Sequence, residues 1–189
     1  MRFEVCLPAI LASEGGFVDD PADPGGATNL GVTRATLSSW LGRAATIADI
    51  EALTPAAVAP IYRARYWDLS RAGDCPPGVD LMVFDEAVNQ GVGHALATLQ
   101  SALGVTADGV LGPATQAAMT SAEPARLIRD IAANRAAGYR ALPEFPKFGR
   151  GWLSRLDRTT VLALRMVPVS RPPIPAAAVV SAAANGAGC

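Results

Sequence analysis

Glu14 is the residue whose type and position most clearly allow chemistry. The apolar residues before it recur at the spacing of one helix face: Phe3, Cys6, Leu7, Ile10 and Leu11. They predict a helix over residues 2–14 in which Glu14 continues the apolar face, before Gly15 and Gly16 end the helix. Burial and the negative end of the helix dipole would both favour a protonated carboxyl, the form of a general acid. An ordinary exposed glutamate in a last helical turn is an equally open interpretation.

The segment after Glu14 offers a second acid–base group. Residues 17–34 contain the turn-forming sequences DDP, DPGG and TNLG, which predict a loop with a short hairpin. This loop carries Asp19, Asp20 and Asp23, and its glycines let the backbone approach a ligand closely. Cleavage of a glycosidic bond needs one protonated and one ionised carboxyl across the bond. Glu14 and a loop aspartate are therefore a candidate glycosidase pair.

The same segment carries a dense motif. The sequences EGGFVDDP (residues 14–21) and DPGGATNLGVT (23–33) closely resemble glycoside hydrolase family 108, a family of bacterial and phage N-acetylmuramidases. The resemblance covers residues 3–166. It continues through these further segments: Tyr62, YWD (66–68), FDEAVNQG (84–91), LQ (99–100), DGVLGPAT (108–115) and GW (151–152). The second half of the match resembles the predicted peptidoglycan-binding part of that family, although residues 108–115 also read as a turn before a helix that begins with proline.

This resemblance implies a mainly α, lysozyme-like fold that cuts the β-1,4 bond between N-acetylmuramic acid and N-acetylglucosamine, with Glu14 as catalytic acid. A weaker similarity to phage-type lysozymes implies that Asp23 activates or orients a water molecule and that the Thr28 hydroxyl holds it. Asp20 competes with Asp23 for this role, and the sequence leaves the choice open. The candidate substrate-binding residues are Phe17, Asp20, Asn29, Tyr66 and Trp67. For the aromatic members, packing in the core is the commoner role of such residues at helical spacing.

The rest of the chain predicts further helices. Thr33 is expected to cap a helix over 34–41, and Thr54 with Pro55 is expected to begin another that leads toward Trp67. Later helices are expected over these ranges: 79–89, 93–103, 113–119, 124–142 and 152–166. We divide the chain into a lysozyme-like catalytic part (1–78), a helical peptidoglycan-binding-like part packed with it (79–166) and a Pro/Ala-rich tail expected to be disordered (167–189).

Composition excludes several other classes of protein. Half of the 189 residues are hydrophobic and the net charge is −1, so the chain should fold and lacks the basic balance of general nucleic-acid binding. Three widely separated cysteines and one histidine, His94, predict free thiols and no metal site. No apolar run reaches the length of a membrane span, and the N-terminus lacks the pattern of a secretory signal.

These observations predict an endolysin-type muramidase that is made in the cytoplasm, needs no cofactor, and acts as a monomer on peptidoglycan glycan strands in the periplasmic wall after release. A holin is the expected partner for export. Two alternatives stay open. One is a lytic transglycosylase, which makes an anhydro product without water, and the other is a non-catalytic protein that binds the cell wall or assists secretion.

Overall fold

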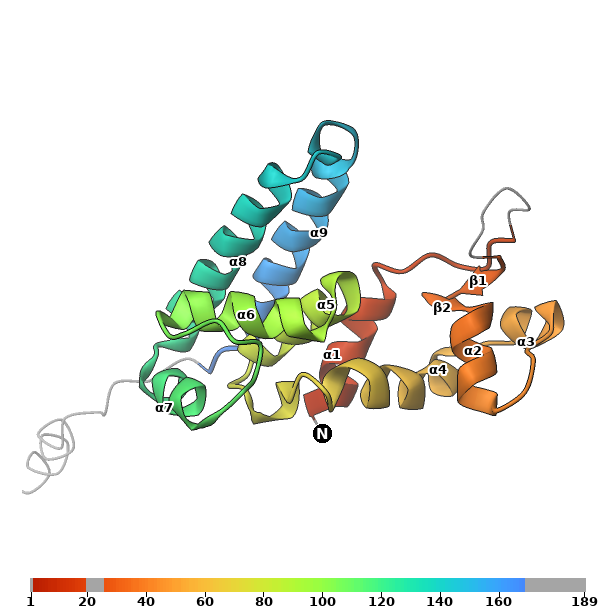
Figure 1. Cartoon of the computed structure of the whole chain (residues 1–189), viewed down its shortest axis with the longest axis horizontal. Coiled ribbons are helices and arrows are strands. Elements are labelled where there is room, and N and C mark those ends of the chain that lie inside the picture. The colour runs from red at the N-terminus through yellow and green to blue at the C-terminus, as the bar shows by residue number, and fades with distance from the viewer. Residues whose placement is uncertain (1, 20–25, 169–189) are drawn as a thin grey trace, which may run out of the picture.

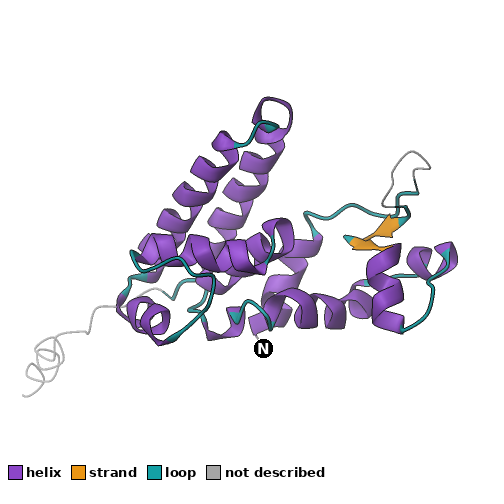
Figure 2. Ribbon diagram, viewed as in Figure 1, coloured by secondary structure: helices purple, strands orange, loops and turns teal. Residues whose placement is uncertain are grey.

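The computed structural model describes residues 2–19 and 26–168. It is a mainly helical fold with one small antiparallel sheet, as predicted (Figure 2). The helical elements of this part of the chain are α1 (Arg2–Leu11), α2 (Arg34–Leu41), α3 (Ile47–Glu51), α4 (Pro55–Tyr62), η1 (Arg63–Trp67), η2 (Ala72–Asp74), α5 (Val79–Gln90), α6 (Val92–Leu103), α7 (Pro113–Ser121), α8 (Pro124–Ala141) and α9 (Phe145–Met166). The strands are β1 (Thr28–Asn29) and β2 (Val32–Thr33).

The hairpin after α1 is tied to the chain that leads into it. Thr28 pairs with Thr33 across the two strands, and Val18 forms an isolated bridge to Thr28 through two backbone hydrogen bonds of 2.8 and 2.9 Å. The segment between Val18 and Thr28 is thus closed at its base. In Figure 1, this hairpin lies beside α2 and α3, on the opposite side of α1 from the long helices.

Capping side chains explain where the short helices α2, α3 and α4 near the hairpin begin. The hydroxyls of Thr33 and Thr54 accept from backbone N–H groups of α2 and α4, as the sequence predicted. Thr46 and Asp49 form a capping box at the start of α3, a helix that the sequence analysis did not predict.

α5 is the central helix of the other side. Its residues from Val79 to Ala87 are all buried, and it packs against α1, α6, α8 and α9. α8 and α9 form a helical hairpin, visible at the top of Figure 1, that rests on α5 and α6. Because α5 is surrounded by helices, polar side chains on it must find partners inside the protein.

α9 begins seven residues earlier than the predicted start at residue 152. The segment 145–151 contains a proline and two glycines, which argued against a helix there. Pro146 lies in the first turn, where a missing N–H costs no helical hydrogen bond, so the helix tolerates it. Most of the predicted disordered tail, residues 169–189, lies outside the described residues.

Two further sequence expectations concern cysteines and membranes. Cys6 and Cys75 are buried free thiols, and burial raises the pKa of each to about 12. Across residues 2–19 and 26–168, no helix has both the length and the apolar character that a membrane span requires.

Candidate active site

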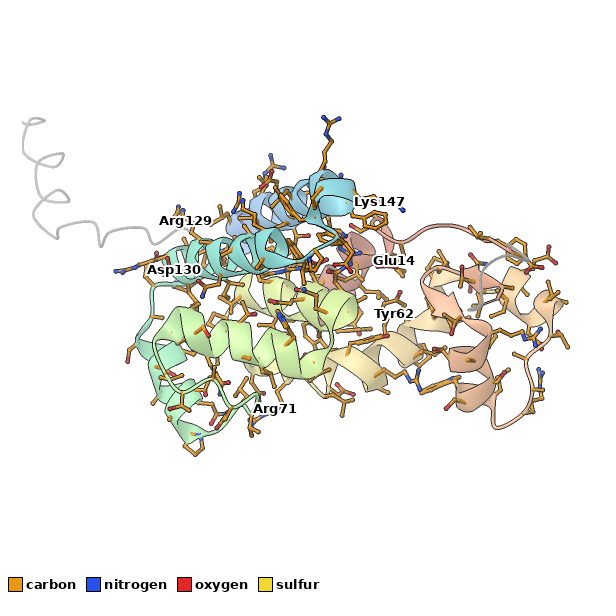
Figure 3. All side chains as sticks on the ribbon, turned by 45° about the horizontal axis from the view of Figure 1, so that its top comes forward. Glu14, Tyr62, Arg71, Arg129, Asp130 and Lys147 are labelled. Carbon is orange, nitrogen blue, oxygen red and sulfur yellow. The ribbon has the colours of Figure 1, made fainter. Side chains whose placement is uncertain are left out.

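Glu14 lies three residues beyond the end of α1, in the turn that connects this helix to the hairpin. Its backbone N–H donates to the carbonyl of Leu11 at 3.2 Å, and the next residue, Gly15, accepts from Leu30 N–H of the hairpin at 3.1 Å. The side chain is 18% exposed. Figure 3 shows Glu14 and Tyr62 in the middle of the molecule, between the long helices and the hairpin side. The backbone at Glu14 and Gly15 is therefore held from both sides, and the Glu14 side chain still reaches the surface.

Gly31, in the turn of the hairpin, lies directly against this carboxyl group. Its φ is +71°, and a Cβ there would stand 2.7 Å from Oε2 of Glu14 and would also clash with the hydroxyl of Tyr62. That hydroxyl donates to the carbonyl of Leu30 at 2.9 Å. Only glycine fits a position that combines this backbone angle with this close approach. Gly31, Tyr62 and Glu14 thus form one tightly packed junction.

Burial raises the pKa of Tyr62, and the nearby Glu14 carboxylate adds to the shift. The phenol keeps its proton at all ordinary pH values as a result. Tyr62 therefore donates a hydrogen bond to the hairpin and places an uncharged side chain next to Glu14.

Arg155 of α9 holds the other oxygen of Glu14. Its Nη1 donates to Oε1 of Glu14 at 3.0 Å, and its Nε donates to Oδ1 of Asp85 on α5, also at 3.0 Å. The Arg155 side chain is 14% exposed. Burial lowers the pKa of this guanidinium, but the carboxylates of Asp85 and Glu14 outweigh burial, so the net shift is upward. A permanently charged group thus contacts the candidate acid.

The predicted residues of the loop and hairpin fall into two groups. Thr28 lies in β1, half-buried, between its two backbone partners Val18 and Thr33. Phe17 is 39% exposed, close in sequence to Glu14. Asp20 and Asp23 lie outside the described residues, within the segment that the Val18–Thr28 pair closes.

The other predicted substrate-binding residues have partners inside the protein. The Asn29 side chain is buried and donates to the carbonyls of Ile50 and Glu51, which attaches the hairpin to α3. Trp67 is only 5% exposed and packs edge-on against Phe3 and Phe84, with ring centroids 5.5 and 5.3 Å apart. This is the core role that the sequence analysis weighed against sugar stacking.

Tyr66 differs from Trp67 in its exposure. It is half-buried, and its ring packs at 5.6 Å against that of Tyr62, beside the Glu14 junction. Tyr66 and Trp67 both lie in the π-helical turn η1, in which Asp68 N–H donates to the carbonyl of Arg63. Of the two aromatic residues in this turn, Tyr66 is the one that packs against Tyr62.

The sequence analysis missed Arg155, Asp85, Tyr62 and Gly31 as site residues. For Arg155 a signal existed, because it lies on the same helix stripe as the buried residues Leu156, Thr159 and Ala163 of α9. A cation on a buried stripe needs an anionic partner. Its partners lie 70 and 141 residues away in sequence, so the pattern could not say which carboxylates they are.

The glycine-rich turn at 108–115 is a packed structural unit. The Gln100 amide donates to Oδ1 of Asp108 at 2.7 Å and to the carbonyl of Val110 at 2.9 Å, and it accepts from Gly109 N–H at 2.8 Å. The hydrogen bond from Gln100 lowers the pKa of Asp108. α7 begins at Pro113, as predicted from the proline.

A cavity of about 690 Å³ between α1 and α4 does not coincide with Glu14. Its lining is mostly apolar, and the two charged residues there, Glu4 and Arg63, pair with each other at 2.7 Å. The described residues contain no group of three or more histidine, cysteine or acidic side chains placed to hold a metal ion.

Comparison with known proteins gives two family matches and one similar solved structure. The sequence model described as Glycosyl hydrolase 108 matches residues 7–91, and that of a Predicted Peptidoglycan domain matches residues 94–157. The solved structure titled "Structure of Brucella abortus SagA" is 41% identical to this chain, with a TM-score of 0.77, and the match covers 89% of this chain and 97% of that one. A comparison with curated protein sequences gave no match.

The two family matches and the similar structure therefore identify a glycoside hydrolase that acts on peptidoglycan. The chain belongs to glycoside hydrolase family 108. The hydrolase match ends with α5, and the second match begins in α6, so the pair Glu14–Arg155 joins the two matched regions.

Proposed function

We propose that this hydrolase is a muramidase, which cleaves the β-1,4 bond between N-acetylmuramic acid and N-acetylglucosamine with Glu14 as general acid. The observation that carries the proposal is the position of the Glu14 carboxyl, at the edge of the core where α1, the hairpin and α9 meet. Arg155 contacts Oε1, whereas Oε2 faces Gly31. A proton on Oε2 could pass to the glycosidic oxygen while Arg155 keeps the group in place.

The second carboxylate is proposed to come from the loop that Val18 and Thr28 close. In this mechanism Asp23 takes a proton from a water molecule that attacks the anomeric carbon, with the Thr28 hydroxyl holding the water and Asp20 as the competing candidate. An aspartate on a separate loop leaves room for water between the two carboxyl groups, which favours inversion of the anomeric centre. The first-formed product would then be the α-anomer.

In a cell, the proposed role is that of an endolysin. The monomeric enzyme would be made in the cytoplasm, pass the membrane with the help of a holin, and lyse the wall by cutting its glycan strands. The match to a peptidoglycan domain supports the substrate class on which this role depends.

Product analysis tests the proposal. Purified peptidoglycan treated with the protein should release fragments that end in a reducing N-acetylmuramic acid by mass spectrometry, and NMR at early times should show the α-anomer. Anhydro products would identify a lytic transglycosylase instead. Wall binding without any cleavage would identify a non-catalytic protein.

Asp23→Asn separates the two aspartates. It should lower turnover strongly and leave substrate binding nearly intact, because the amide cannot accept the proton of the attacking water. Asp20→Asn is the matched variant, and a larger loss there would assign the base to Asp20. A dominant β-anomer would contradict inversion with either residue.

A further inference from the structure

Five charged side chains form an alternating chain from the candidate acid into the core. From Glu14, the order is Arg155, Asp85, Arg135 and Glu86, and we refer to these residues together as the charge chain. Asp85 accepts from Arg155 on Oδ1 at 3.0 Å and from Arg135 on Oδ2 at 2.8 Å. Arg135 Nε lies 3.6 Å from Glu86 Oε2. The two carboxylate oxygens of Asp85 therefore connect two guanidinium groups.

Burial makes the inner part of this chain rigid. The side chains of Asp85, Glu86 and Arg135 are at most 1% exposed, so no bulk water competes for their hydrogen bonds. Arg135 Nη2 also donates to the hydroxyl of Tyr139 at 3.1 Å, which in turn donates to Asn89. At the far end, Glu86 accepts from Thr98 at 2.7 Å and lies 2.9 Å from His94 Nδ1. Arg135 and Glu86, the two inner members of the charge chain, are thus held by further hydrogen bonds.

The members of the charge chain come from different parts of the sequence. Its three carboxylates belong to the segment that matches the hydrolase family, whereas both guanidinium groups belong to the segment that matches the peptidoglycan domain. Arg155 is planar and uses two different nitrogens for Asp85 and Glu14, so the position of Asp85 fixes the direction from which Glu14 is held.

We propose that Arg155 is a positioning residue for Glu14, held in place by Asp85 and Arg135, and that the peptidoglycan-domain segment is in this way a part of the active site. The inference rests on the proposed function, because it assumes that Glu14 is the acid. Glu14 comes directly before two glycines, in a turn that by itself leaves the side chain several orientations. Arg155 selects one orientation, with Oε1 toward α9 and Oε2 toward Gly31.

Three variants of α9 test the proposal. Arg155→Met removes both hydrogen bonds and the charge, Arg155→Lys keeps the charge, and Arg158→Met is the matched control on an exposed position of the same helix. We would measure kcat and KM on solubilised glycan strands, the pH dependence of kcat/KM, and unfolding in urea to verify the fold.

Arg155→Met should lower kcat by about 10- to 100-fold with little change in KM, because a misplaced catalytic group costs turnover rather than binding. Its pH profile of kcat/KM should differ from the wild-type profile, because the variant removes the positive charge that contacts Glu14. Arg155→Lys should recover part of kcat and the wild-type profile. Arg158→Met should match the wild type in every measurement.

A folded Arg155→Met protein with wild-type kcat and pH profile would overturn the proposal. If Arg155→Met does not fold, Arg155→Lys decides alone, because an unchanged kcat in a variant that cannot form the planar two-carboxylate contact overturns it equally. Glu14→Gln in the same assay keeps the two hypotheses apart. Full activity of Glu14→Gln would reject the proposed function, whereas an inactive Glu14→Gln beside a fully active Arg155→Met rejects only the positioning role.

Discussion

The segments on either side of Glu14 hold this residue by different means. On the hairpin side the contacts come from the backbone, through short helices, a tight turn at Gly31 and the hydrogen bond between Leu30 and Gly15. On the side of α5, α8 and α9 they come from charged side chains on long helices. The hairpin side shapes the surface around Glu14, and the helical side contacts its carboxyl group through Arg155.

This difference predicts which substitutions lower the activity and which lower the stability of the protein. Changes at Glu14 or in the hairpin turn should affect turnover more than folding, because few buried groups depend on them. Changes inside the charge chain should affect folding, because a buried charge without its partner is costly. Substitutions on the two sides of Glu14 test that separation.

The largest expected effect is that of Glu14→Gln. The glutamine carbonyl can still accept from Arg155, but it cannot deliver a proton, so kcat should fall by about 10²- to 10⁴-fold with nearly unchanged unfolding. Turnover on purified peptidoglycan and urea unfolding provide the two measurements. Glu51→Gln, an exposed glutamate on the hairpin side, is the control for loss of one carboxylate. Near-wild-type turnover of folded Glu14→Gln would show that another residue is the acid.

Arg135→Met should have the largest effect on stability. It removes the guanidinium from between Asp85 and Glu86, both about 1% exposed, and leaves two buried carboxylates short of a partner. Breaking such a buried pair costs about 3–5 kcal/mol of unfolding free energy. Arg129→Met, six residues earlier at an exposed position of α8, should stay within about 0.5 kcal/mol of the wild type. Equal stabilities of the two variants in urea would contradict the structural role of the charge chain.

Gly31→Ala tests the hairpin side with a smaller effect. Gly31 and Gly42 have nearly the same φ, +71° and +67°, so alanine brings similar backbone strain of about 1–2 kcal/mol to both. Only at Gly31 does the new Cβ meet Glu14 and Tyr62, because nothing lies within 4 Å of the Cβ at Gly42. Turnover should therefore fall about 10- to 100-fold in Gly31→Ala and stay unchanged in Gly42→Ala. Similar turnover in both variants would mean that the close contact with Glu14 has no catalytic importance.

The sequence predicts the features that depend on residues close together in the chain better than those that depend on long-range contacts. Features set by neighbouring residues were largely predictable: the caps at Thr33 and Thr54 and the proline start of α7 are confirmed. The first helix, however, ends at Leu11 and not at the predicted residue 14, so Glu14 lies in the turn that follows it. The first turns of α9 were missed because proline and glycine disfavour helices on average, and packing against α8 overrides that preference.

Features set by long-range contacts were not predictable from one sequence. FDEAVNQG was recognised as part of a family motif, but the partners of Asp85 lie on α8 and α9, 50 and 70 residues further along the chain. Helical periodicity marks which positions are buried and gives no information about which buried charges meet. The orientation of Glu14 by Arg155 needed the three-dimensional structure.

The smallest expected effect concerns Glu86 and the pH dependence of stability. Burial raises the pKa of this carboxyl above the ordinary value of 4.5, against the opposing influence of Arg135, Thr98 and His94. An acid with a raised pKa in the folded state favours folding below its ordinary pKa, and this contribution is lost as the pH rises through the raised value. The wild type should therefore lose stability relative to Glu86→Gln as the pH increases upward from about 4.5, by at most about 1.4 kcal/mol per pH unit.

Urea unfolding of the wild type and Glu86→Gln between pH 4 and 6 measures this difference. Glu144→Gln, at the exposed start of α9, controls for the removal of one carboxylate. A difference that moves the other way, with the wild type gaining on Glu86→Gln as the pH rises, would mean that the attraction of Arg135 outweighs burial. The ionised form of Glu86 would then stabilise the folded state. The free-energy cost of burying the charges of the charge chain would be lower than their burial implies.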